Sequence, residues 1–435
     1  MVIYDLHNDL GVSKILLKKK GAGYTLPQIK VTGEDFYYSV AQINNEVKNL
    51  FGLEVYTLRC LYNQEDSITL LSVNLYVQEL VSPLSISSIP DGYVWVTASE
   101  LHERDFTDLL SQIFYRMSQD WEKGNKENDR VTWSTFGWYE KAHYLFRVEL
   151  EKLDFKSDKS FEQVRTWERS SILRVSSDHD EVYIKSFPSM FEYEPRITEW
   201  LLNHFPKNVP CILKIGQNSE VGSFMLMPRY TGSWLYDVKE LSIWQDVVRT
   251  YSTIQQNCIS EEKNIIKLGI SYRPIERLIE GTKELINNKQ LLKSGLDPLE
   301  DNEIAFLKEN LSFLIEKCLQ LSDYHIPYTL EHGDLWSGQV MVSNENDQTS
   351  IYFNDWSDCS WTHPFFSMPF FLEDIEAELE GIPNARDVLI NTYLETWNAY
   401  EPIDRLKKLY NIVMLIGPLH NAVLYSDYIF PHMEF

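Results

Sequence analysis

Residues 331–342 read EHGDLWSGQVMV, and residues 351–356 read IYFNDW. The first segment carries an aspartate, Asp334, in a tight loop and an amide side chain, Gln339, five residues later. The second segment contains another aspartate, Asp355. Phosphoryl transfer from a nucleoside triphosphate requires such a set, because one carboxylate orients the acceptor hydroxyl and the other oxygens hold Mg²⁺ on the phosphates.

A β-hairpin is expected to bring these three side chains together. Residues 340–343 and 349–353 have the pattern of strands, and the polar residues 344–347 between them predict a turn. The hairpin folds the chain back, so both aspartates and the glutamine converge at one end of it. An isolated His-Gly-Asp is more often an ordinary turn, and it is the joint occurrence of tripeptide, spacing, hairpin and second aspartate that favours a catalytic loop.

The motif resembles the signature of the aminoglycoside phosphotransferase and choline kinase superfamily, which is His-Gly-Asp, four residues, Asn, and then a strand that ends in Asp-Trp or Asp-Phe. The resemblance implies a bilobal protein-kinase-like phosphotransferase domain that uses ATP, or another NTP, and Mg²⁺. It implies that Asp334 is the catalytic carboxylate and Asp355 the principal magnesium ligand. Gln339 stands where the family has Asn, so it keeps the amide oxygen but is one methylene longer.

Two functions therefore stay open. One is an active kinase that phosphorylates a hydroxyl group of a small molecule, with Gln339 as the second metal ligand. The other is a pseudokinase, in which the longer amide marks a lost metal geometry and the chain serves as a nucleotide-binding or scaffold module.

An upstream hairpin extends the resemblance. Residues 169–175 and 181–185 alternate apolar and polar residues on either side of a polar turn at 176–180. The resemblance implies that Lys185, at the end of the second strand, binds the nucleotide phosphates; a solvated strand-edge lysine is the simpler alternative. Ser170 and Ser171 stand where the family often has small hydroxyl residues, and backbone N–H groups there can cradle phosphate.

The same resemblance implies two further nucleotide contacts. A helix glutamate pairs with the lysine, and Glu194 is the choice, with Glu192 and Glu199 as competitors. The apolar strand around Met225 and Met227 corresponds to the hinge whose backbone binds adenine, whereas an ordinary buried strand is the alternative. A strand-rich lobe over residues 159–231 and a helical lobe over residues 232–435 are expected, the latter including an amphipathic helix from 303 to 321.

Residues 1–120 resemble the layout of a Nudix hydrolase, an α/β domain. Strands are expected at 14–18, 24–27, 54–62, 67–79 and 92–96, with a helix that ends near residue 53. A working Nudix helix needs several glutamates to hold Mg²⁺, but here Glu46 remains alone, with Asn49 and Leu50 at the other positions. The expectation is a degenerate Nudix-like domain used for binding or assembly; an unrelated α/β domain is the alternative. Residues 121–158 form a polar linker and a connecting helix over 140–153.

Composition restricts the cellular setting. The 435 residues suffice for two or three domains, and no apolar run has membrane-spanning length. The N-terminus lacks a basic segment before an apolar one, so no signal peptide is expected. Five scattered cysteines without metal-ligand spacing suggest a reducing cytoplasm and buried thiols. A net charge of −24 argues against nucleic acid as a partner. The oligomeric state stays open.

The small molecule that would accept the phosphoryl group is the part of the function that the sequence determines least. Residues 301–435 hold 22 Asp and Glu against 6 Lys and Arg, a net charge of −16, and five acids lie within 373–380. A solvated helix face is the usual explanation. The alternative is that some of these acids, with Trp356 and Trp361, surround a hydroxylated acceptor that carries a protonated amine; the simpler account makes both tryptophans core residues.

Overall fold

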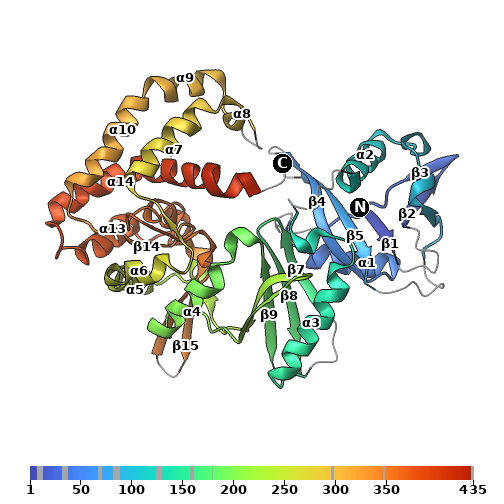
Figure 1. Cartoon of the computed structure of the whole chain (residues 1–435), viewed down its shortest axis with the longest axis horizontal. Helices are drawn as coiled ribbons and strands as arrows, with labels where there is room; N and C mark the ends of the chain where they lie inside the picture. Colours follow the sequence, from blue (N-terminus) through green and yellow to red (C-terminus); the bar gives the residue numbers. More distant parts are fainter. Residues whose placement is uncertain are drawn as a thin grey trace. The chain divides into compact units, whose positions relative to one another are not determined.

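The computed structural model describes residues 1–6, 13–31, 38–66, 71–81, 89–123, 130–156, 161–178, 180–294, 298–345 and 348–432. The protein is a mixed α and β structure (Figure 1). It divides into two compact units, one of Met1–Ser189 with Ile212–Arg229 and the other of Met190–Cys211 with the chain from Tyr230 onward. The finer division into four segments stays a prediction.

The first unit begins with a six-stranded mixed sheet of order β3-β2-β1-β5-β4, with β6 paired to β2. Its parallel pair joins β1 (Val2–Asp5) and β5 (Leu71–Leu80), and the other pairs are antiparallel. This confirms the expected strands and the α/β character, apart from residues 67–70 of the expected 67–79 strand, which lie outside the described residues; no finding assigns the domain to the Nudix family. The remaining strands are β2 (Lys14–Lys20), β3 (Gly23–Thr25), β4 (Val55–Asp66) and β6 (Tyr93–Thr97).

Helix α1 (Ala41–Phe51) covers this sheet with one apolar stripe. Ile43, Val47 and Phe51 recur every four residues and are buried, as the 3.6-residue period requires. The helix ends at Gly52, whose φ of 67° lies in the left-handed region that glycine adopts without strain. A second helix, α2 (Leu109–Lys123), precedes the polar linker.

The first unit also contains a five-stranded antiparallel sheet of order β10-β11-β9-β8-β7. The expected hairpin is confirmed as β8 and β9, although residue 179 of its turn lies outside the described residues. Strands β7 and β10 were not foreseen. The five strands are β7 (Glu162–Trp167), β8 (Ser170–Ser176), β9 (Glu181–Phe187), β10 (Lys214–Asn218) and β11 (Gly222–Pro228).

Helix α3 (Trp138–Lys152), the expected connecting helix, joins the cores of the two sheets. Trp138 packs against Tyr56 of β4 with ring centroids 5.7 Å apart, and Phe146 packs against Phe224 of β11 at 5.0 Å. The chain just before α1 extends the five-stranded sheet, because Val40 N donates to the β7 backbone and a bridge pairs Ser39 with Arg165. The first domain is therefore continuous with this sheet.

The second unit is mostly helical. Helix α10 packs against α7 and α14, and α13 packs against α5 (Figure 1). Among the described residues its principal helices are α4 (Glu194–His204), α5 (Leu241–Cys258), α7 (Ile275–Asn287), α9 (Asp301–Glu309), α10 (Leu311–Gln320), α13 (Ala385–Glu395) and α14 (Ile403–Leu424).

The prediction of one continuous helix over 303–321 is wrong, because the segment forms two helices, α9 and α10. Asn310 sits at the junction, and its side-chain amide donates to the Phe306 carbonyl at 2.9 Å. An asparagine that bonds nearby backbone groups competes with helix propagation, which explains the break.

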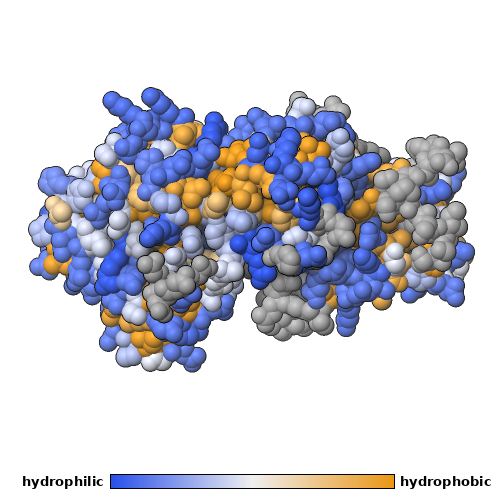
Figure 2. Space-filling model, turned by 90° about the horizontal axis from the view of Figure 1, so that it is seen from below, coloured by the Kyte–Doolittle hydropathy of each residue, from blue (hydrophilic) through white to orange (hydrophobic). Residues whose placement is uncertain are grey.

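The expectation of buried thiols holds for only some of the cysteines, and one face of the surface is largely polar. On the face shown in Figure 2, hydrophilic residues predominate. All five cysteines are free thiols; Cys258, Cys318 and Cys359 are buried as expected, but Cys211 is exposed. Of the helices in the described ranges, none combines the length and apolarity needed to traverse a membrane.

Candidate active site

Two small β-ladders in the second unit frame the motif loops. Strand β14 (Thr329–Glu331) pairs antiparallel with β17 (Ser360–Thr362), and β15 (Val340–Glu345) pairs with β16 (Gln348–Phe353). The expected hairpin is thus confirmed, apart from turn residues 346–347, which lie outside the described residues. Because Asp334 follows β14 and Asp355 follows β16, both aspartates lie in loops that leave paired strands.

The loops meet at Gln339. Its Nε2 donates to Oδ2 of Asp334 at 3.2 Å, five residues back along the chain. Its carbonyl oxygen accepts from the backbone N of Asn354 at 2.8 Å and from Nδ2 of the same residue at 3.2 Å. Gln339 therefore contacts one aspartate through its side chain and fixes the residue before the other through its backbone.

His332 also contacts both loops. Its Nε2 lies 2.8 Å from the Asn354 carbonyl, and its Nδ1 accepts from the backbone N of Asp334 at 3.4 Å. The acceptor role of Nδ1 places the ring proton on Nε2. The ring is fully buried and packs 4.6 Å from the Trp356 ring. This positioning role was not foreseen, although the motif itself contains the histidine.

Backbone conformation restricts two positions of the site. Gly333 has φ 82°, and a Cβ there would lie 2.2 Å from the Asp358 carbonyl oxygen. Asp355 has φ 55° without being glycine. A side chain in this left-handed region costs about 1–2 kcal/mol, and such strain persists only where the surroundings enforce it. The hydrogen bonds around Asn354 supply that enforcement.

A buried carboxylate supports the glycine turn. Glu331 is fully buried, and it accepts from the backbone N of Gly333 at 2.8 Å and from the Tyr251 hydroxyl at 3.3 Å. Burial raises the pKa of Glu331 to about 7. Sequence reasoning missed this residue; the only signal was an acid at the end of an otherwise apolar strand.

Helix α4 contacts the Asp355 loop. The Tyr193 hydroxyl, just before α4, donates to the Ser357 carbonyl in the 3-10 turn Trp356–Asp358. Glu194 begins the helix and is 1% exposed, whereas Glu199 is exposed and Glu192 is half-buried. Of the three candidates, Glu194 is thus the most enclosed; its pairing with Lys185 stays a prediction.

In the first unit, Lys185 lies on β9, the central strand of the five-stranded sheet, and is 6% exposed. The alternative of a solvated strand-edge lysine is therefore wrong. Lys185 faces Met225 of β11 in the strand register, and Met227 pairs with Tyr183. Met225 is buried and Met227 is half-buried.

Residues 168–169 form the turn between β7 and β8. Ser170 and Ser171 follow this turn, at the start of β8. Both hydroxyls have protein partners: Ser170 Oγ accepts from Trp167 Nε1 at 3.0 Å, and Ser171 Oγ lies 3.3 Å from the Tyr56 hydroxyl. The turn is attached to the first sheet by an ion pair of 2.8 Å between Glu168 and Arg59.

The acidic run separates into an exposed part and one interior member. Glu378 is half-buried, and its carboxylate accepts from the hydroxyl of Ser337, which lies between Asp334 and Gln339 in the motif. Burial raises the pKa of Glu378. Its neighbour Glu376 instead forms an exposed ion pair with Arg386 at 2.5 Å. The exposed acids are Glu373, Asp374, Glu376 and Glu380.

The tryptophans after Asp355 follow the simpler of the two accounts given by the sequence. Trp356 and Trp361 are each 1% exposed, so they are core residues and offer no open ring face to an acceptor. Trp336, inside the motif, is instead 44% exposed. Its ring lies nearly parallel to that of Tyr236, with centroids 6.5 Å apart.

No family model and no curated protein matches this chain. Solved structures do. A GDP complex of an aminoglycoside 2'-phosphotransferase is 15% identical, with 66% of this chain and 99% of that chain covered at a TM-score of 0.42. A choline kinase from Cryptosporidium parvum is 13% identical, with coverage of 66% and 90% at 0.48. An ethanolamine kinase from Plasmodium vivax is 15% identical, with coverage of 72% and 90% at 0.44.

Proposed function

We propose that this chain is a Mg²⁺-dependent phosphotransferase that moves the γ-phosphoryl group of ATP, or another NTP, to a hydroxyl group of a small molecule. The observation that carries the proposal is the joining of the two motif loops at Gln339, which contacts Asp334 and fixes Asn354 beside Asp355. Phosphoryl transfer depends mainly on positioning and charge stabilisation, so a rigidly connected pair of carboxylate loops suits it.

Asp334 is the residue that meets the acceptor. Its carboxylate accepts the hydroxyl proton while the acceptor oxygen forms a bond to the γ-phosphorus. The bond from that phosphorus to the bridging oxygen breaks, and a nucleoside diphosphate leaves. The amide of Gln339, at 3.2 Å, and the backbone contact through His332 hold the carboxylate in its orientation.

The oxygens beside Asp334 fit a magnesium ion. Mg²⁺ prefers oxygen ligands and is usually held by one or two carboxylates together with substrate phosphates and waters. Asp355 supplies a carboxylate and Gln339 an amide oxygen. Within the described ranges, no cluster of three His, Cys, Asp or Glu side chains would hold a metal alone, so nucleotide oxygens are required to complete the shell. When bound, the ion neutralises charge on the phosphates.

Lys185 and Glu194 are assigned to the nucleotide phosphates and to the orientation of that lysine. Both are almost completely buried, which is costly for charged groups unless opposite charges face them. The β7–β8 turn, with backbone N–H groups after Glu168, is assigned to cover the phosphates. Met225 and Met227 mark the strand whose continuation binds the base.

For the acceptor, Trp336, Tyr236 and Glu378 replace the buried tryptophans as the proposed wall. One exposed ring, Trp336, belongs to the motif and the other, Tyr236, lies beside it, and the Glu378 carboxylate accepts from Ser337. Open aromatic faces beside carboxylates suit a hydroxylated molecule with a protonated amine. Phosphorylation of matched cationic, neutral and anionic sugars tests this; a preference for anionic acceptors would end the cationic assignment.

The decisive experiment compares Asp334→Ala with Asp404→Ala, an exposed carboxylate at the start of α14. Nucleotide binding by titration calorimetry with Mg²⁺ should stay within about threefold in both variants, since Asp334 acts on the acceptor. Turnover should fall by about 10³-fold or more only in the first. Equal loss of binding and turnover would contradict the role of Asp334.

A pseudokinase is the second candidate, because the Gln339 amide donates to Asp334 in place of an open metal site. Gln339→Asn discriminates the two. An active enzyme built around glutamine should lose roughly three- to tenfold in turnover, since asparagine is too short for the 3.2 Å contact. A large gain in turnover would instead identify the natural chain as impaired.

A further inference from the structure

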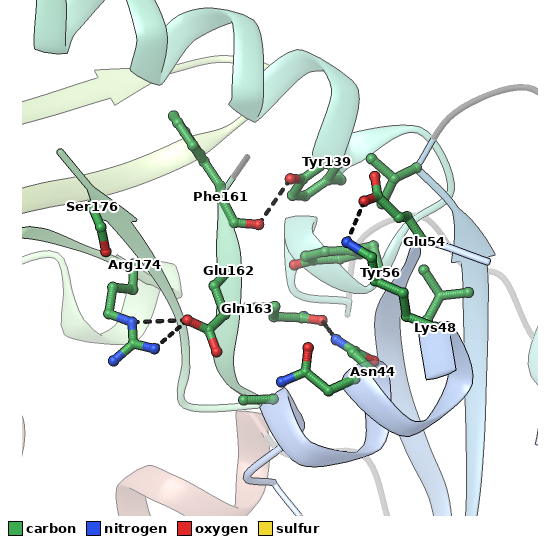
Figure 3. A pocket seen from close by; sticks show the side chains of 14 residues that line it. Asn44, Lys48, Glu54, Tyr56, Tyr139, Phe161, Glu162, Gln163, Arg174 and Ser176 are labelled. Carbon is green, nitrogen blue, oxygen red and sulfur yellow. Dashed lines mark hydrogen bonds and ion pairs between the residues drawn. The ribbon is translucent and has the colours of Figure 1, made fainter. Parts of the chain in front are cut away.

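A cavity of about 420 Å³ lies in the first unit, between helix α1 and the β7–β8 hairpin (Figure 3). Its walls come from α1, the start of β4, α3 and the two strands. The volume is in the range of small-molecule sites. None of the residues assigned above to phosphoryl transfer lines it.

The floor of this cavity, here named the α1 pocket, contains Asn44 and Gln163, which belong to a hydrogen-bond network. Gln163 Oε1 accepts from Asn44 Nδ2 at 3.0 Å and from the Thr57 backbone N at 2.8 Å, while Gln163 Nε2 donates to the Thr57 carbonyl at 2.7 Å. Asn44 Oδ1 in turn accepts from Thr57 Oγ1 and Gln78 Nε2. Because Gln163, Asn44 and Thr57 bond one another, these groups are held in place before a ligand binds.

One wall is apolar in character. The Tyr139 hydroxyl donates to the Phe161 carbonyl at 3.1 Å, and the Tyr56 hydroxyl lies against Ser171. Both rings are buried, and Phe161 and Val55 are buried beside them. Because both hydroxyls already have hydrogen-bond partners, this wall provides an apolar contact surface for a ligand.

The charges of the lining are two ion pairs that balance. Arg174 binds Glu162 through Nε at 2.9 Å and also through Nη2, and both side chains are 35% exposed. Lys48 binds Glu54 at 2.7 Å with exposures of 58% and 45% (Figure 3). The exposed Lys48–Glu54 pair stabilises the fold by at most about 1 kcal/mol, so it opens easily.

We propose that the α1 pocket binds a zwitterionic small molecule with an apolar body, which is the chemistry of an apolar amino acid. The ligand carboxylate takes the place of Glu54 on Lys48, and its ammonium takes the place of Lys48 on Glu54. This exchange leaves every charge paired, whereas a singly charged ligand leaves one carboxylate or ammonium without a partner. The apolar body lies against the Tyr139 and Phe161 wall.

Occupancy of the pocket reaches the β7–β8 hairpin. Gln163 of the floor belongs to β7, and Tyr56 of the wall contacts Ser171 of β8. In the proposed function this hairpin covers the nucleotide phosphates, so the second step rests on that function. A ligand that immobilises the hairpin lowers the ordering cost of nucleotide binding and is thereby positively coupled to it.

The test uses L-phenylalanine and L-leucine as probes, with 2-phenylethylamine and 3-phenylpropanoate as single-charge analogues of the first. Titration calorimetry on the full chain without nucleotide should detect binding of at least one amino acid and at least about tenfold weaker binding of both analogues. Failure of both amino acids to bind, or equal binding of an analogue, would overturn the proposal.

Matched variants locate the site. Lys48→Met should weaken amino-acid binding by about tenfold or more, because the carboxylate loses its cation. Lys141→Met is the control: Lys141 forms a similar pair with Glu220 at 2.7 Å, with exposures of 52% and 61%, away from the pocket lining. Thermal melting verifies folding of both variants. Equal weakening by the two would overturn the assignment.

The coupling is measured last, as nucleotide affinity with and without the bound amino acid. A rise in affinity supports the second step, and an unchanged affinity refutes it. Amino-acid binding without any nucleotide binding would refute the proposed phosphotransferase and leave the α1 pocket intact, so the two failures are distinguishable.

Discussion

Helix α1 and the loops around Asp334 and Asp355 are two polar regions of the molecule that are built from different groups. The loops keep two carboxylates and hold them through backbone contacts of His332, Gln339 and Asn354. The helix keeps Glu46 and turns amides and a lysine toward a cavity. Paired carboxylate loops suit chemistry on a metal-bound phosphate, whereas a cavity lined by amides and ion pairs suits the binding of a polar ligand.

The largest expected contrast is in activity. Asp355→Asn keeps the side-chain shape and an amino acid that tolerates a left-handed backbone, but it removes the charge for Mg²⁺. Turnover should fall by about 10³-fold or more with the fold intact. Glu46→Gln in α1 should leave turnover within about twofold. Steady-state kinetics and circular dichroism check both; a large loss in Glu46→Gln would show that α1 takes part in the chemistry.

A second contrast concerns the two left-handed glycines. Gly52→Ala at the end of α1 should cost about 1 kcal/mol in unfolding free energy, the penalty of a Cβ at positive φ. Gly333→Ala should cost at least about 3 kcal/mol and abolish turnover, because its Cβ also meets the Asp358 carbonyl. Denaturant unfolding measures both, and equal costs would refute the argument from the close backbone approach.

The smallest contrast is in pH dependence. Burial raises the pKa of Glu331 and of Glu79, in β5, from 4.5 to about 7. The folded state therefore holds these protons more tightly, so each contribution to stability is fully present below pH 4.5 and is lost as the pH rises through 7. The loss is at most roughly 3 kcal/mol per group.

Glu331→Gln and Glu79→Gln should each flatten the fall in melting temperature between pH 4.5 and pH 7, the interval between the unfolded and the folded pKa of these carboxyl groups. Only Glu331→Gln should alter the pH profile of turnover, because Glu331 supports the Gly333 turn. A turnover profile changed equally by Glu79→Gln would remove the distinction between the two regions.

Local sequence patterns were sufficient to predict the hairpins and the motif loop. The alternation of residues and the turn composition were sufficient for the β8–β9 and β15–β16 hairpins, and the joint occurrence of the His-Gly-Asp tripeptide, the spacing, the hairpin and the second aspartate indicated Asp334, Gln339 and Asp355. The interruption at Asn310 was missed because side-chain competition for a carbonyl does not disturb the apolar period. The burial of Trp356 and Trp361 was decided by packing around the loop rather than by their neighbours in sequence.

Contacts between residues far apart in the chain could not be predicted from a single sequence. Gln163 bonds Asn44 across 119 positions, and Tyr56 meets Ser171 across 115. Nothing near Gln163 distinguishes it from a strand glutamine that faces solvent. For the same reason, neither the α1 pocket nor the continuity between the first domain and the five-stranded sheet could be predicted, although the residue types that line the pocket are visible.

Helix α3 has a consequence for how this chain is made. One buried stripe of this helix contacts both sheets, with Trp138 against Tyr56 and Phe146 against Phe224. On the ribosome, the helix and the first sheet emerge before β11 is translated, so during that interval Phe146 has Trp138 and Phe161 as ring partners but lacks Phe224. A nascent chain in which part of this apolar stripe is uncovered is prone to misassembly. A gene truncated to start after α3 would deprive Phe224 of its cover.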